Sequence, residues 1–358
     1  VKDILGEEDG TFFAEVFNMR EDGNFRDESS GHQINRNITY LTASTSQLAK
    51  RYKLTEEEFL ARIESLRQKL FVVREKRIHP LKDDKILTDW NGLMIAAFAK
   101  GAQVLGDEQY AAAARNAADF VLSTLRQSDG QLLKRYREGV AALPAHLEDY
   151  AFTIWGLLEL YQTTFELDYL QHAVDLNQTM LDLFWDEKSG GFFFTADDGE
   201  ELIVRTKEIF DGAIPSGNSV AALGLLLIGR ITGNIELEKK AATVGKVFSA
   251  QVNRSPMGYT QLLLATEFAM GPAYEIVIVG DPGSADTQDM TELVQRLYVP
   301  NRVLLLKSTG EDGEKLSKLA PFTKTQYTID GKATAFVCQN YACQAPTTDL
   351  KAVAKALK

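Results

Sequence analysis

The sequence predicts a mainly α-helical protein in which helical hairpins repeat around a toroid, followed by a small α/β unit. Three helices that are apolar on nearly all faces recur along the chain, an amphipathic helix follows each of them, and the loops between partners are very short. A helix that is apolar all round is buried, and a short loop makes consecutive helices antiparallel neighbours. This repeat predicts an inner ring of buried helices and an outer ring of amphipathic ones.

The three predicted inner helices begin in the same way. They cover residues 87–106, 145–165 and 214–233. Their polar openings start at Thr88, His146 and Ser216, which are 58 and then 70 residues apart. Ser, Thr, Asp and Asn at a helix start accept hydrogen bonds from otherwise unpaired N–H groups. We expect the three openings to gather at one rim of the ring, where a cleft can form; a plain all-α domain with capped helices is the simpler alternative.

The outer helices have charges on one face only. They are predicted over residues 107–125, 168–185 and 234–252. The first two lead into glycine-punctuated runs, "DGQLLKRYREG" and "SGGFFFTADDGEELIVR", which are typical of hairpins. Gly-Asp and Gly-Asn steps join inner to outer helices.

The two ends of the chain have other patterns. Residues 55–77 form a charged amphipathic helix that opens with a capping box, Thr55 and Glu58, after a polar, irregular stretch over residues 18–50. After residue 272 the runs "AYEIVIVGD", "NRVLLLK" and "ATAFVCQ" are predicted strands around one helix, "ADTQDMTELVQRLY". We therefore divide the chain into an N-terminal segment (1–85), the helical-hairpin toroid (86–272) and the α/β unit (273–358).

Composition excludes several classes of function. The 358 residues carry a net charge of -11, so the chain as a whole has no electrostatic footprint for nucleic acid or an anionic membrane. The longest apolar run, residues 220–228, is far shorter than the roughly 20 residues that span a bilayer. Two Cys and four His offer little for a zinc site, and we predict neither metal nor cofactor. Few cysteines and no signal peptide favour a cytoplasmic location, and the Val1 start indicates a piece of a longer protein.

Two local motifs receive plain structural interpretations. Cys338 and Cys343 are expected to be structural thiols, with a disulfide or a labile thiol pair as alternatives. The loop "VGDPGSADT" follows a predicted strand but lacks both the GxGxxG pattern and a P-loop lysine, so it predicts a strand–turn–helix step without a nucleotide.

Four motifs in order resemble one family. "HPLKDDKILTDWNGLMIAAFAK", "HLEDYAF", "DGAIPSGNSVAA" and "AFVCQNYACQAPTTD" are similar to the thioredoxin-domain-containing, spermatogenesis-associated protein 20-like family. The resemblance implies a six-hairpin (α/α) toroid like that of N-acylglucosamine 2-epimerases and six-hairpin glycosidases, incomplete here. It also implies a preceding thioredoxin-like domain as a partner. No CxxC motif is present in this chain, so the redox role of such a domain is not carried here.

The second rim opening carries the strongest candidates for chemistry. His146, Glu148 and Asp149 lie within one helical turn, and His146 and Asp149, three residues apart, share a face. A histidine beside a carboxylate serves as general acid or base, and in epimerases of the similar fold rim histidines move the proton beside a sugar carbonyl. The alternative is that the carboxylates interact with the helix start and His146 is structural.

The first opening adds a carboxylate beside an aromatic ring. We assign Asp89 to the catalytic set with His146, and Trp90, Asn91 and Tyr150 to substrate binding, because an aromatic face stacks on a sugar while oxygens take its hydroxyl groups. Paired carboxylates also suit glycoside hydrolysis. The alternative is that Asp89 caps its helix and Trp90 fills the core.

The third opening contributes Asp211 and Asn218 as ligand contacts, with packing as the alternative. The sequence thus predicts a carbohydrate-active or carbohydrate-binding toroid, with epimerase and glycosidase chemistry both open. The opposing hypothesis is a non-catalytic scaffold or partner domain for the missing thioredoxin-like domain. An incomplete toroid exposes the apolar flanks of its inner helices, so we also expect this chain to cover them, either by self-association or with its N-terminal segment.

Overall fold

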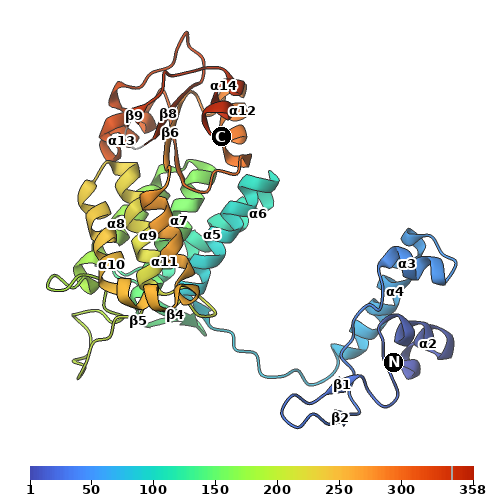
Figure 1. The fold of residues 1–358 in the computed structure, drawn as a ribbon. Helices are drawn as coiled ribbons and strands as arrows, with labels where there is room; N and C mark the ends of the chain where they lie inside the picture. The colour runs from blue at the N-terminus through green and yellow to red at the C-terminus, as the bar shows by residue number, and fades with distance from the viewer. Residues whose placement is uncertain (340–341) are drawn as a thin grey trace. The chain divides into compact units, whose positions relative to one another are not determined.

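Two compact units make up the chain in this computed structural model, which describes residues 1–339 and 342–358. The first unit covers residues 1–83 and the second covers residues 84–358 (Figure 1). The elements of the first unit are α1 (Lys2–Leu5), α2 (Glu7–Val16), β1 (Phe25–Arg26), β2 (Gln33–Ile34), α3 (Thr45–Arg51) and α4 (Glu56–Arg74). Phe12, Leu48 and Phe59 are among its buried side chains. The predicted capping box is confirmed, because Thr55 and Glu58 exchange hydrogen bonds at the start of α4.

Helical hairpins form the first part of the second unit (Figure 1). Its helices are α5 (Thr88–Leu105), α6 (Glu108–Phe120) with a final π-helical turn η1 (Val121–Leu125), α7 (Leu147–Thr164), α8 (Leu167–Phe184), α9 (Gly217–Thr232), α10 (Ile235–Arg254), the 3-10 turn η2 (Pro256–Gly258) and α11 (Thr260–Met270). Helices α5, α7, α9 and α11 pack side by side in that order, and α6, α8 and α10 pair with the inner helices that precede them. The predicted fold class, an (α/α) toroid of helical hairpins with a small α/β unit, is confirmed.

The short turns between partners have the predicted chemistry. Gly106 and Gly233 end α5 and α9 in the left-handed conformation, with φ of 68° and 74°. The next residues, Asp107 and Asn234, cap α6 and α10 through their side-chain oxygens. Glycine reaches this conformation without the steric cost that a Cβ imposes, so each chain reversal needs only one or two residues.

The apolar character of the inner helices has two outcomes. Helices α7 and α9 are buried along most of their length, as an apolar surface on all faces predicts. Helix α5 is not, because Met94, Val104 and Leu105 are 47%, 55% and 64% exposed. Met94 and Leu105 are eleven residues apart and therefore share a face of α5, whereas Val104 also lines a cavity beside Trp155 and Glu159 of α7.

Glycines set the crossing of α5 and α7. A Cβ added to Gly92 would lie 2.5 Å from the backbone carbon of Phe152, and one added to Gly156 would lie 2.7 Å from the carbonyl oxygen of Gly92. Real Cβ atoms do not approach backbone so closely, so both positions require glycine. The two helix backbones therefore touch near their polar starts.

The α/β unit closes one end of the helices, opposite the hairpin formed by β4 and β5 (Figure 1). Its elements are β6 (Tyr274–Val279), α12 (Ala285–Arg296), β7 (Arg302–Lys307), α13 (Glu311–Leu319), the turn η3 (Pro321–Thr325), β8 (Thr334–Gln339), β9 (Ala342–Cys343) and α14 (Leu350–Ala356). The strand order is β7-β6-β8-β9, with β6 parallel to β7 and antiparallel to β8. Alternate residues of β6 enter different cores: Ile276 and Ile278 pack with α12 and α14, whereas Val277 and Val279 pack with α13 and the helical hairpins.

Side chains of the inner helices anchor this sheet. Gln162 of α7 accepts a hydrogen bond of 2.9 Å from the backbone N–H of Leu304 in β7. Arg230 of α9 donates to Glu275 of β6 at 2.6 Å, and both residues are buried. The α/β unit thus shares polar contacts and one hydrophobic core with the hairpins, although the sequence placed a boundary at residue 272.

Two local expectations differ from the structure. Cys338 and Cys343 are joined in a disulfide, so the prediction of two structural thiols is wrong. The register of β8 and β9 brings the two residues directly opposite each other, which spacing alone does not reveal. The run "SGGFFFTADDGEELIVR" (residues 189–205) forms no hairpin; its Phe192 makes an isolated bridge to Trp185, which precedes the run. Residues 340 and 341 of the fourth motif lie outside the described residues.

No helix in the described part of the chain is both long and apolar enough to cross a membrane.

The α5–α7 crossing yields a stability prediction. Gly92→Ala places a methyl group against the backbone of α7 and should destabilise the protein by about 1–3 kcal/mol, despite the better helix propensity of alanine. Gly245→Ala in α10 is the control, because its Cβ would have nothing within 4 Å, and it should stabilise by about 0.5–1 kcal/mol. Thermal unfolding followed by circular dichroism measures both. Equal changes in stability for the two variants would contradict the close approach of the α5 and α7 backbones at Gly92.

Candidate functional site

The starts of α5, α7 and α9 meet beside a three-stranded sheet, β3 (Ile86–Leu87), β4 (Leu133–Arg137) and β5 (Val140–Pro144). Asp149 of α7 accepts a hydrogen bond from the backbone N–H of Asp89 in α5 at 3.1 Å. A Cβ added to Gly217 in α9 would lie 3.1 Å from Cγ of Glu148. The structure therefore brings together all three openings that the sequence assigned to one rim.

Asp149 is the centre of the rim. Its side chain is fully buried, and it accepts hydrogen bonds from three donors: the N–H of Asp89, the N–H of His146 at 2.7 Å, and Nζ of Lys134 at 3.2 Å. Burial raises the pKa of Asp149 to about 7, although the positive charge of Lys134 and the bond from His146 act in the opposite direction. The group therefore changes protonation state near neutral pH.

Lys134 is a member of the cluster that the sequence did not single out. Its Nζ donates to Oδ2 of Asp89 at 2.7 Å as well as to Asp149. Burial disfavours its charge, but the two carboxylates outweigh burial and raise its pKa above the ordinary value. The sequence held one weak sign that Lys134 points inward. It follows Leu132, which is buried, by two residues, and residues two apart lie on the same side of a strand.

His146 caps α7 from a half-buried position. Its ring stacks on Phe194, with centroids 4.7 Å apart and planes tilted by 16°. Burial, and then the charge of Lys134, lowers the pKa of His146 below the ordinary value, so the imidazole is neutral at pH 7. Its Nδ1 is buried without a hydrogen-bond partner among the described residues, which leaves Nε2 as the nitrogen that a ligand can reach.

Glu148 lies one residue before Asp149, and its environment is different. It is half-buried, and burial raises its pKa above the ordinary value of a glutamate. The structure shows no hydrogen bond from its carboxyl group to another described residue, whereas Asp89 and Asp149 have acceptor oxygens occupied. Glu148 and His146 are thus the rim groups that retain capacity for a ligand.

The predicted binding residues are distributed between surface and core. Trp90 is 57% exposed and stands next to Asp89 at the rim. Asn91 donates its amide to the carbonyl of Leu87 at 2.8 Å, which ties the first turn of α5 to β3. Tyr150 is buried, and its hydroxyl oxygen accepts the backbone N–H of Leu132 at 2.9 Å.

Asp211 and Asn218 hold chain segments at the third opening. The carboxylate of Asp211 accepts the N–H of Ser216 at 2.9 Å and the N–H of Gln261 at 2.8 Å, so it ties the starts of α9 and α11 to one another. Asn218 is fully buried and exchanges hydrogen bonds with both backbone groups of Phe192. Their polar atoms are therefore engaged within the protein.

A cavity of about 400 Å³ lies among the inner helices, on the side of the α/β unit. Trp155 and Glu159 of α7 line it, and Lys100 of α5 pairs with Glu159 at 2.7 Å. Sequence reasoning missed these residues because they occupy the middle of helices that read as uniformly apolar. Within the described residues no group of three or more His, Cys, Asp or Glu side chains is placed to hold a metal ion.

Comparison with known sequences gives a consistent set of relatives. The chain is 33% identical to human spermatogenesis-associated protein 20 over 352 residues, which is 95% of this chain and 45% of that protein, in its C-terminal part. The resemblance to the spermatogenesis-associated protein 20 family is confirmed. The mouse protein is 32% identical, and an uncharacterised protein of Caenorhabditis elegans is 26% identical over 93% of this chain. The chain spans less than half the length of these relatives, and no family model matches it.

Solved structures with a related arrangement of helices include sugar-acting enzymes. A cellobiose 2-epimerase from Bacillus thermoamylovorans aligns with a TM-score of 0.41 at 18% identity, covering 48% of this chain and 46% of that one. A GH76 α-mannanase from Bacteroides thetaiotaomicron aligns with a TM-score of 0.42 at 15% identity, covering 67% and 68%.

The raised pKa of Asp149 predicts a pH-dependent stability. The folded protein holds a proton that the unfolded chain releases above its ordinary pKa of 3.8, so this contribution is complete below that pH and is lost as pH rises through about 7. Asp149→Asn removes the titration. Between about pH 5 and about pH 8 the free energy of unfolding should fall less for the variant than for the wild type, by about 2–3 kcal/mol.

Asp186→Asn is the matched control, because Lys207 and two backbone N–H groups lower the pKa of Asp186 to about 2 and keep it ionised over that whole range. Its effect on stability should be constant with pH. Urea unfolding at a series of pH values measures both variants. If the free energy of unfolding changed with pH in the same way for the wild type and for Asp149→Asn, the raised pKa of Asp149 would be contradicted.

Proposed function

We propose that this chain is a carbohydrate-active domain that transfers protons at the rim where α5 and α7 begin. The observation that carries the proposal is that a neutral His146 and a half-buried Glu148 begin the same helix turn, next to a lysine held by two buried carboxylates. The exposed ring of Trp90 at the same rim offers a flat apolar face of the kind on which a sugar stacks.

Each rim residue has a role that follows from its environment. A neutral imidazole accepts a proton, so His146 serves as general base. Glu148, whose pKa burial raises, is the complementary acid. Asp149 and Asp89 position Lys134 and the two helix starts. Lys134 supplies positive charge near the place where negative charge develops on a sugar oxygen.

This division favours epimerase or isomerase chemistry over glycoside hydrolysis. Hydrolysis needs two carboxyl groups that face the bond from opposite sides. Two of the three rim carboxylates, those of Asp89 and Asp149, have oxygens engaged in the Lys134 network. A base and an acid that shuttle a proton at a carbon beside a carbonyl require only His146 and Glu148.

Sugar binding and proton transfer test the proposal. In the full chain, a panel of mono- and disaccharides should contain a sugar that raises the unfolding temperature, because a ligand of the folded state stabilises it. In D₂O that sugar should gain deuterium at the carbon beside its carbonyl, as seen by proton NMR. His146→Gln should abolish the exchange while the thermal shift persists, and His79→Gln, at an exposed site in the first unit, should change neither.

If no sugar raises the unfolding temperature, the protein lacks the proposed binding site. If a sugar raises it but gains no deuterium, the site binds sugar without moving a proton. Glu148→Gln separates the two roles further. The substitution should slow deuterium exchange strongly at neutral pH and less at high pH. At high pH the wild-type glutamate has also lost its proton, so the wild type and the variant then lack the same acid.

One observation favours the second candidate, a partner domain without catalysis. Met94 and Leu105 expose apolar side chains on one flank of α5, which is a surface that a further helix would cover. A thioredoxin-like domain and the remaining hairpins of a longer parent chain are the partners that the family resemblance implies. A cytoplasmic location likewise stays a proposal.

The exposed flank of α5 predicts self-association when nothing else covers it. Sedimentation velocity at increasing concentration should show a monomer–dimer equilibrium, and Leu105→Glu should shift it at least tenfold toward monomer, because a charge is costly to bury. Met257→Glu is the control, since Met257 is 90% exposed on the turn η2, away from this flank. A monomer at all concentrations would count against the partner hypothesis.

A further inference from the structure

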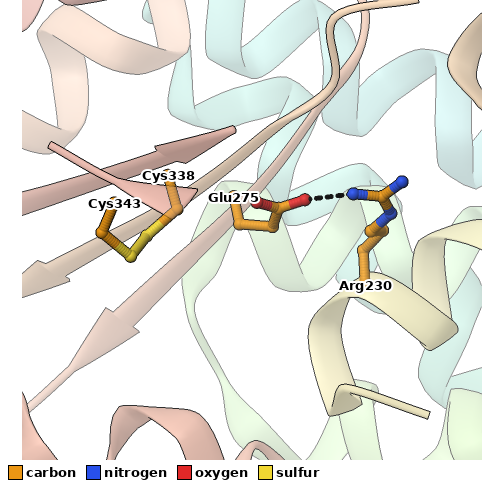
Figure 2. Close-up of a disulfide and its surroundings, with 4 residues drawn as sticks. All are labelled: Arg230, Glu275, Cys338 and Cys343. Carbon is orange, nitrogen blue, oxygen red and sulfur yellow. Dashed lines mark hydrogen bonds and ion pairs between the residues drawn. A yellow bond between two sulfur atoms is a disulfide. The ribbon is translucent and has the colours of Figure 1, made fainter. Parts of the chain in front are cut away.

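The disulfide of the α/β unit joins two neighbouring strands at the edge of its sheet. Cys338 of β8 lies directly opposite Cys343 of β9, and β9 is the last strand in the order β7-β6-β8-β9 (Figure 2). On its other side Cys338 lies opposite Glu275 of β6. Cys343 therefore lies on the edge strand of the sheet, and Cys338 lies on the neighbouring strand.

The two sulfur-bearing residues differ in access to solvent. Cys338 is only 3% exposed, whereas Cys343 belongs to the exposed residues. Thiol–disulfide exchange proceeds by attack of a thiolate along the line of the sulfur–sulfur bond, so access decides which sulfur is attacked. An external thiolate can approach the Cys343 side, and the Cys338 side is covered by protein.

A cavity of about 340 Å³ lies on the inner side of the bond. Both cysteines line it, together with Phe322, Phe336 and the buried pair of Arg230 and Glu275. Figure 2 shows the Glu275 carboxylate between the disulfide and the Arg230 guanidinium. Because Arg230 neutralises Glu275, a Cys338 sulfur released on this side meets an ion pair instead of an uncompensated negative charge.

We propose that the Cys338–Cys343 pair is a thiol–disulfide exchange site whose attacked sulfur is that of Cys343 and whose substrate is a thiol or dithiol. The thiolate forms a bond to Sγ of Cys343, the bond to Sγ of Cys338 breaks, and Cys338 leaves as a thiolate that takes up a proton. The second thiol of a dithiol then displaces Cys343. The cysteine pair is reduced to two thiols, and the dithiol is oxidised to its disulfide.

The surrounding structure can survive this reaction. Hydrogen bonds that need no sulfur hold the segment after β9, including Gln344 N–H to the carbonyl of Val337 at 3.0 Å and a reciprocal pair between Ala335 and Thr347. Helix α14 buries Val353 in the core that it shares with α12. Cleaving the bond therefore releases a cross-link at the sheet edge while the tail keeps its anchors.

Mass spectrometry of the intact chain tests the order of attack. The oxidised, folded protein is incubated with reduced glutathione, quenched in acid, and digested, and the mixed disulfide is located by fragmentation. We expect glutathione on Cys343 about tenfold more often than on Cys338, with no change in circular dichroism. Oxidised glutathione should restore the cross-link after the free thiol is removed.

Single-cysteine variants provide an independent check. Cys338→Ser leaves the exposed Cys343, and Cys343→Ser leaves the buried Cys338, so each removes the same bond. A maleimide should label the first variant about tenfold faster than the second under native conditions and at equal rates in urea. The rates in urea control for intrinsic reactivity.

Three results would overturn the proposal. They are a disulfide that resists millimolar dithiothreitol until the protein unfolds, a mixed disulfide found mainly on Cys338, and reduction that unfolds the α/β unit. None of these readouts uses a sugar or a rim residue, so they are independent of the proposed carbohydrate activity.

Discussion

The buried carboxylate of Asp149 is the interaction on which the rim depends. It accepts hydrogen bonds from the starts of two helices and from a lysine of a separate hairpin, so one side chain fixes α5, α7 and β4 relative to one another. A carboxylate without these donors would be too costly to bury, and the donors would in turn lack an acceptor. The glycine contacts between α5 and α7 bring the helix starts close enough for this arrangement to form.

The opposite ends of the same helices are held by a different set of polar contacts. Gln162 and Arg230, near the ends of α7 and α9, bind the backbone of β7 and the side chain of Glu275 in β6. A buried ion pair contributes little net stability, because desolvation offsets the attraction, but it penalises any packing that separates the charges. The inner helices are thus fixed at both ends, and the rim and the exchange-prone disulfide occupy opposite ends of one rigid frame.

The sequence predicted the helices better than the contacts between them. Periodicity and turn chemistry are local, so the hairpins, the capping box at Thr55 and the coincidence of three polar helix starts could be derived from the chain. Lys134 could not, because its role depends on a β-hairpin folding back over α5 and α7. The disulfide was also missed, since only the register of β8 and β9 places Cys338 opposite Cys343. The exposed flank of α5 has the same composition as buried helices, and only the absence of a neighbour in the described chain distinguishes it.

Among the polar residues of the rim, those whose donors and acceptors are already bonded within the protein differ from those that can still bind a ligand. Asp211 accepts two backbone N–H groups, and Asn218 satisfies both backbone groups of Phe192, so a ligand would have to displace bonds that fix two helix starts. Displacing buried hydrogen bonds costs about 1–3 kcal/mol for each group left unpaired, which few ligand contacts regain. His146 and Glu148 carry no such obligation, and burial has already shifted both toward their neutral forms. In the proposed chemistry a neutral imidazole can accept a proton at pH 7, and the raised pKa of Glu148 suits it better to the acid role than that of an ordinary glutamate.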